Sequence, residues 1–154
     1  MEQYDSYEFS SLVEISRLAN SLQTVMDMGM EDITSKQWLL LMVLGKCEKK
    51  PNLNQLAEKC GITRQSAKQL VDRLVKKDLV KIEKDDSNKL NILIVITEKG
   101  RNWGIINLER NLKFVKKLYS SISQDDIRIF AEVHKKLLHN LADIKEKVKM
   151  GELL

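Results

Sequence analysis

The side chains in this chain that are best suited to chemistry cluster in one polar segment, from Arg64 to Arg73. Arginine and lysine can donate to N7 and O6 of guanine, glutamine can make a two-point contact with adenine, and serine can reach a base or a phosphate. The residues that face outward if this segment is a helix are Arg64, Gln65, Ser66, Lys68, Gln69 and Arg73. These residue types suit a recognition helix that contacts base edges of double-stranded DNA, but any surface helix can show such a face, so the neighbouring elements decide.

The elements needed to position such a helix lie on either side of it. Leu53, Leu56, Ala57 and Cys60 repeat at the spacing of one helix face, and Gly61 ends that helix. Thr63 begins the next helix after a short turn, which is the layout of a helix-turn-helix. The second helix of this motif fits the major groove, whose width is about 12 Å.

The net charge of +4 conceals a strong asymmetry. Residues 46–77 carry nine bases and three acids, whereas residues 1–33 carry one base and seven acids. A basic segment gains affinity for DNA by releasing the counterions that are condensed on phosphates. The charge distribution therefore favours contact with DNA at the helix-turn-helix and opposes it at the N-terminal segment.

The pattern changes to alternation after the recognition helix. Val80 to Lys84 alternates apolar and polar residues, residues 85–89 are turn-forming, and Leu90 to Ile96 is rich in β-branched residues. These features predict a β-hairpin, or wing. Lys84, Asn88 and Lys89 lie within this predicted hairpin.

The remaining segments have the periodicity of helices. We expect helices over residues 8–26, after Thr34, from Glu98 to about Tyr119, and from Ser123 to about Val148. The apolar run over residues 38–44 predicts a helix that is buried on all sides. The fold class is therefore mainly α, a winged helix-turn-helix core with a short β-hairpin wing and flanking N- and C-terminal dimerisation helices. We expect one folding unit with three parts: an N-terminal dimerisation helix (residues 1–33), a winged helix-turn-helix DNA-binding region (34–97) and C-terminal dimerisation helices (98–154).

Composition excludes several other classes of protein. Six glycines and one proline in 154 residues do not suit a β-sandwich, and no run reaches the roughly 18 apolar residues of a membrane span. Two cysteines cannot form a disulfide framework, and no cysteine or histidine pair has zinc-ligand spacing. No phosphate-binding loop or nucleophile motif is present. We expect a cytoplasmic protein that is not an enzyme, with no metal, cofactor or membrane contact.

Several short segments resemble the MarR family of winged-helix regulators. Residues 33–38 (ITSKQW) look like its "LTxxQ" helix start, and Leu53 to Ile62 resembles its "LTxxELAxxLGI" helix. Thr63 to Val80 resembles its recognition helix, and residues 96–100 (ITEKG) resemble the "LTxxG" that closes the wing. The matches occur in the family's order over about residues 33–100.

Two positions depart from the family pattern. The wing arginine that reaches the minor groove in the family is absent, and the nearest equivalent segment is Asn88-Lys89-Leu90. The resemblance makes Lys84, Asn88 and Lys89 the candidate DNA contacts of the wing. Lysine lacks the planar fork of arginine, so Lys84 and Lys89 are weaker substitutes. Asp78 replaces the usual glycine after the recognition helix; aspartate is one of the residues that tolerate the left-handed conformation that this position requires.

The resemblance implies a homodimer that places two recognition helices in successive major grooves of a pseudo-palindromic operator, as a repressor. It also implies a small aromatic effector bound between the dimerisation helices and the winged core. Candidate pocket residues are Met26, Met30, Trp38 and Met42, although their spacing also fits ordinary core packing.

Two alternatives remain open from the sequence. Cys47, between Lys46 and Lys49, is a candidate redox sensor, whereas Cys60 occupies a position where the pattern expects a core leucine. The chain could also be a winged-helix protein-interaction module whose basic helix binds an acidic partner.

Overall fold

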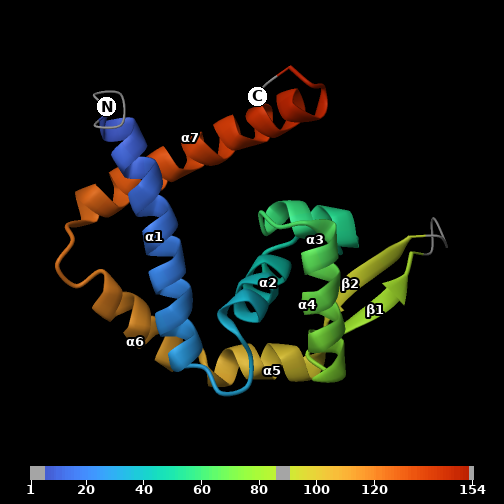
Figure 1. Cartoon of the computed structure of the whole chain (residues 1–154). Helices are drawn as coiled ribbons and strands as arrows, with labels where there is room; N and C mark the ends of the chain where they lie inside the picture. The colour runs from blue at the N-terminus through green and yellow to red at the C-terminus, as the bar shows by residue number, and fades with distance from the viewer. Residues whose placement is uncertain (1–5, 86–90, 153–154) are drawn as a thin grey trace. The chain divides into compact units, whose positions relative to one another are not determined.

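The computed structural model describes residues 6–85 and 91–152, which form two compact units on either side of the junction between Ile106 and Asn107 (Figure 1). The elements of the first unit are α1 (Tyr7–Met28), α2 (Ser35–Gly45), α3 (Leu53–Lys59), α4 (Arg64–Lys76), β1 (Val80–Lys84), β2 (Ile92–Ile96) and α5 (Glu98–Ile106). Those of the second unit are α6 (Leu108–Leu118) and α7 (Gln124–Lys149). The predicted fold class, mainly α with a β-hairpin wing, is confirmed.

Side-chain caps fix where the helices of the winged segment begin. The Thr34 hydroxyl accepts from the amide of Gln37, whose side chain accepts from the amide of Thr34 in return. Asn52 and Gln55 form the same reciprocal capping box at α3. These caps pair amide groups of the first turn that have no partner within the helix.

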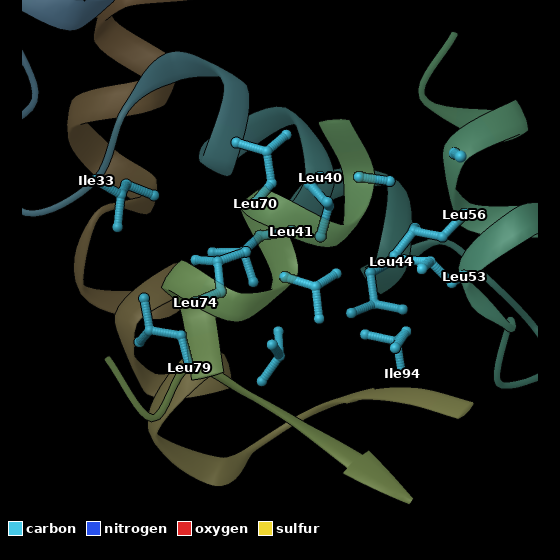
Figure 2. Packing of buried hydrophobic residues seen from close by; sticks show 14 residues of the cluster. Ile33, Leu40, Leu41, Leu44, Leu53, Leu56, Leu70, Leu74, Leu79 and Ile94 are labelled. Atoms are coloured by element: carbon cyan, nitrogen blue, oxygen red, sulfur yellow. The ribbon is translucent and has the colours of Figure 1, made fainter. Parts of the chain in front are cut away.

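The hydrophobic core lies among α2, α3, α4 and the hairpin (Figure 2). Each of these elements contributes a side chain with at most 1% of its surface exposed: Leu40, Leu56, Leu74 and Ile94. Removing one such side chain typically costs about 2–5 kcal/mol. The core therefore holds α4 firmly on its apolar side.

The wing is an antiparallel pair in which Val80 lies opposite Ile96 and Lys84 opposite Ile92. The segment before α3 extends this sheet: the Ile94 amide donates to the Pro51 carbonyl at 2.9 Å, and Asn52 bridges to Leu93. β2 begins at Ile92. Leu90, at which the predicted strand began, lies outside the described residues.

The turn between α4 and β1 is tied to the start of α5. Asp78 has a φ of 60°, as predicted for the residue that replaces glycine there. The Thr97 hydroxyl donates to the Asp78 carbonyl at 2.7 Å and accepts from the Gly100 amide at 3.0 Å. Gly100 packs so closely that a Cβ atom there would lie 2.1 Å from the Leu79 carbonyl oxygen.

Two predictions about helices were wrong in detail. The single helix expected from Glu98 to Tyr119 is interrupted at Asn107, which separates α5 from α6. Gly104 and Asn107 have low helix propensity, which weakens the segment where the break occurs. The α2 helix is not buried on all sides, because Leu39 is 41% exposed.

The helices that flank the winged segment bury little. No described residue of α1, α6 or α7 is buried. At the start of α7, the Ser123 hydroxyl accepts from the Asp126 amide, but the Asp126 carboxylate accepts from that hydroxyl rather than from the Ser123 amide. This is half of a capping box. Across residues 6–85 and 91–152, no helix is long and apolar enough to cross a membrane.

Candidate nucleic-acid interface

The α4 helix places most of its apolar residues on one side and its polar residues on the other; Val75 is the exposed apolar residue. Ala67, Leu70, Val71 and Leu74 are buried in the core. The six predicted base-contacting residues, Arg64, Gln65, Ser66, Lys68, Gln69 and Arg73, are all exposed on the remaining surface of the helix. Burial of the apolar side thus orients the donor-rich side toward solvent, where a large ligand can reach it.

The first turn of α4 is held by Thr63. Its hydroxyl accepts from the Ser66 amide at 3.1 Å and donates to the Ser66 hydroxyl oxygen at 2.9 Å. The Ser66 hydroxyl proton is therefore available to another acceptor. The side chains near this helix start, where a helix-turn-helix generally makes its base contacts, are presented by a capped and ordered turn.

Lys68 makes an ion pair within its own helix. Its ammonium lies 2.7 Å from the Asp72 carboxylate, one helical turn further along. Both side chains remain largely exposed, at 63% and 46%. The sequence analysis placed Lys68 on the outward face but did not identify Asp72 as its partner. Asp72 therefore orients Lys68 and partly neutralises it.

A second ion cluster, which sequence analysis missed, lies at the base of the wing. Glu83 of β1 accepts from Lys50 at 2.5 Å through Oε2 and from Lys81 at 2.9 Å through Oε1. The hydrogen bond from Lys50, followed by that from Lys81, lowers the pKa of Glu83 to about 2. Lys81 and Glu83 are visible as alternate residues of one strand, but only the pairing of residues 51–52 with β2 brings Lys50 close.

Only one of the three predicted wing residues lies in the part of the chain that the structure describes. Lys84 is exposed at the end of β1. Asn88 and Lys89 lie outside the described residues. The DNA contacts of the wing therefore remain predictions.

The junction of α1 and α2 is held by two polar contacts. The Asp27 carboxylate accepts from the Ser35 amide at 2.6 Å, and this backbone hydrogen bond is the main cause of the lowered pKa of Asp27. Lys77, at the end of α4, donates to the Asp32 carbonyl at 2.6 Å. The loop between α1 and α2 is thereby attached to both α2 and α4.

Three of the predicted effector-pocket residues, Met30, Trp38 and Met42, pack against the hydrophobic core and are partly buried. Met26 is partly buried on α1. An open groove of about 600 Å³ lies instead beside the Asp78 turn and the first turns of α5, lined by Asp78, Leu79, Thr97, Glu98, Lys99, Asn102, Trp103 and Ile106. None of the four predicted residues lines this groove.

The two cysteines lie in different environments. Burial, followed by the proximity of Cys47, raises the pKa of the Cys60 thiol to about 11, so Cys60 stays protonated at neutral pH. Cys47 is partly buried, and its thiol donates to the Val43 carbonyl at 3.3 Å. No group of three or more potential metal ligands is found among residues 6–85 and 91–152.

Comparisons with known proteins agree with this architecture. The MarR family model matches residues 31–89. A MarR protein from Peptoclostridium difficile has a TM-score of 0.81 at 15% identity, covering 96% of this chain and 95% of its own. A SlyA-like transcription regulator from Listeria monocytogenes has a TM-score of 0.77 at 22% identity, covering 93% and 96%.

A third structure concerns the regulation of DNA binding of Bordetella bronchiseptica BpsR by 6-hydroxynicotinic acid; its TM-score is 0.70 at 13% identity, covering 82% of this chain and 98% of its own. No curated protein matches the chain in sequence. The chain is a winged-helix protein with the fold of transcriptional regulators. The MarR family model matches its winged segment, and the solved structures that share the fold of the chain include proteins described as transcriptional regulators.

Proposed function

We propose that this protein is a homodimeric repressor that binds a pseudo-palindromic operator in double-stranded DNA and releases it when a small aromatic effector binds. Such a regulator works in the cytoplasm, where it meets the chromosome. The proposal combines the family assignment with the chemistry of α4.

The observation that carries the proposal is the division of α4 into two sides. One side is fixed in the core by four buried residues, and the other presents six exposed donors next to a capped first turn. A helix held in this way can enter the major groove without rearrangement of its backbone. The excess of nine bases over three acids in residues 46–77 supplies attraction to phosphates.

The first test measures DNA binding by fluorescence anisotropy. A duplex is first selected from random sequence by wild-type protein, and its affinity is then compared with that of a scrambled duplex at two salt concentrations. The variant Arg64→Ala with Lys68→Ala removes two donors from α4. The matched control, Lys113→Ala with Lys117→Ala, removes the same charge from α6.

Loss of base contacts should weaken binding to the selected duplex by about 1–3 kcal/mol for each good contact, while the scrambled duplex loses less. The α6 control should keep the ratio of the two affinities. If wild-type protein selects no sequence, and the α4 and α6 variants behave alike, the proposed function is wrong.

Homodimerisation is supported by the apolar residues of α7. Phe130, Val133, Leu137, Leu141, Ile144 and Val148 follow one stripe of the helix, and between 38% and 59% of each side chain is exposed. Exposed apolar stripes of this length usually mark interaction surfaces. A second copy of the chain would bury the stripe and supply the second α4 helix that a pseudo-palindromic site needs.

An effector site near α2 is supported by Trp38. Its indole N–H is buried, and no acceptor for it is found among the described residues. A buried donor without an acceptor is costly, so a polar ligand atom at this position would be favourable. BpsR, whose DNA binding is regulated by 6-hydroxynicotinic acid, offers the ligand class. Hydroxylated aromatic acids are therefore the compounds to add to the anisotropy assay.

A further inference from the structure

The cluster of Lys50, Glu83 and Lys81 occupies the outer face of the wing sheet. Val80 and Ile94, on the other face, are each 1% exposed and belong to the core. Side chains alternate between the faces of a strand, so Lys81 and Glu83 share the outer face with Leu93, the partner of Glu83 on β2. Lys50 reaches Glu83 across β2 from the short segment that pairs with the other edge of that strand.

This cluster lies beside the candidate DNA-contacting helix. Lys50 precedes α3, and Lys81 and Glu83 belong to β1; both α3 and β1 pack against α4. Figure 1 shows the hairpin extending from the end of α4. Two lysines at this position could contribute to phosphate binding, but both carboxylate oxygens of Glu83 are engaged with them.

Folding stability explains little of why Glu83 pairs with Lys50 and Lys81. The Lys50 and Lys81 side chains are 54% and 57% exposed and that of Glu83 is 28% exposed, and ion pairs near the surface contribute little to folding. DNA binding would be sensitive to the same lysines, because each phosphate that a lysine neutralises changes the slope of log K against log salt by about 0.9. With a pKa of about 2, Glu83 keeps its negative charge at every pH at which DNA binding is measured.

We propose that Glu83 is a specificity-determining residue that holds Lys50 and Lys81 away from DNA phosphates and so lowers affinity for non-operator DNA. This inference rests on the proposed function as a DNA-binding regulator. A base held by a carboxylate gains less by meeting a phosphate, since the existing ion pair must first be broken. Sequence-independent binding is therefore reduced, while base contacts from α4 are unaffected.

The test compares Glu83→Gln with wild-type protein on a mixed-sequence duplex over a range of salt concentrations. Glu109→Gln is the matched control, because Glu109 also forms an exposed ion pair, at 2.8 Å to Lys113, but lies on α6. A third variant, Glu83→Gln with Lys50→Met and Lys81→Met, removes the lysines that the first variant releases. Circular dichroism checks that each variant is folded.

Glu83→Gln should bind mixed-sequence DNA more tightly, with a slope steeper by about 0.9 for each released lysine that gains a phosphate. The triple variant should lose this gain, and Glu109→Gln should match wild type. The ratio of affinities for selected and mixed-sequence DNA should fall in Glu83→Gln alone.

Weaker binding by Glu83→Gln would show that Glu83 braces the wing, and an effect equal to that of Glu109→Gln would show only a change in total charge. Either result overturns the inference while leaving the proposed function standing. Wild-type protein that binds no DNA of any sequence would instead overturn the proposed function, and the inference with it.

Discussion

At the scale of single residues, one carboxylate holds the start of α2. The Asp27 side chain at the end of α1 accepts from the Ser35 amide at 2.6 Å, and Ser35 is the first residue of α2. A negative charge at a helix N-terminus is favourable because the first amides have no partners within the helix. Asp27 thus stabilises α2 and fixes α1 next to it.

The Asp27→Asn variant tests this contact through its pH dependence. The pKa of Asp27 is lowered from its usual 3.8 in the folded protein, so the charged form contributes its full stability above that value. This contribution is lost as the pH falls through the folded pKa. We expect the variant to be less stable by about 0.5–1 kcal/mol at neutral pH. In acid below the folded pKa, the difference should disappear.

Urea unfolding at several pH values measures both quantities. The variant Glu31→Gln, which removes a charge from an exposed side chain in the adjoining loop, serves as the control. A wild-type advantage over Asp27→Asn that persists unchanged in acid would contradict the assignment to the charged form.

At the scale of elements, Gly100 allows α5 to pack against the turn after α4. A Cβ at this position would lie 2.1 Å from the Leu79 carbonyl oxygen and 2.9 Å from the Ile96 side chain. Alanine has a higher helix propensity than glycine, so helix formation alone favours the substitution by up to about 1 kcal/mol. The close backbone contact opposes it more strongly.

Gly100→Ala should therefore destabilise the protein, by about 1–3 kcal/mol or more. Gly104→Ala is a matched control in the same helix, because a Cβ there meets no atom within 4 Å. The control should be neutral or more stable, by up to about 1 kcal/mol. Chemical unfolding of the two variants measures the change in the free energy of unfolding, which should have opposite signs. Equal behaviour of the two would show that the contact with Leu79 is not decisive.

Local signals in the sequence were sufficient to predict most elements. Thr34 and Thr63 act as the predicted caps, Gly61 ends the turn after α3 with a φ of 66°, and Asp78 adopts the predicted left-handed conformation. These features depend on residues a few positions apart. The break at Asn107 was missed, because apolar periodicity continues on both sides of it.

Features that depend on distant parts of the chain could not be predicted. Lys50 meets Glu83 only because residues 51–52 pair with β2, and the need for glycine at position 100 depends on the position of Leu79. Neither composition nor local periodicity indicates which distant segments of the chain will meet. The exposed donors of α4 were predictable because helical periodicity alone assigns them to one face.

At the scale of the whole molecule, the proposed dimer depends on α7. Leu137 and Leu141 lie one turn apart on its apolar stripe and are 38% and 59% exposed. Replacing both with serine should remove about 1.5–3 kcal/mol of apolar burial for each side chain that the dimer covers. We expect sedimentation velocity to show two chains for wild type and a shift toward one chain for the variant.

Lys135→Ser with His139→Ser, on the opposite side of α7, should leave the sedimentation coefficient unchanged. Wild-type protein that sediments as a single chain at every concentration would rule out the dimer.

The lack of buried residues in α1, α6 and α7 has a consequence for how the proposed function depends on the number of protein copies in the cell. Isolated helices are marginal in water, and a folded state held together by a second copy obeys mass action. With the dimer as the folded unit, the melting temperature rises with protein concentration, and dilution favours unfolding. A cell that makes few copies would then lose both folded protein and operator occupancy. Operator occupancy would therefore depend more steeply on copy number than it does for a monomeric regulator.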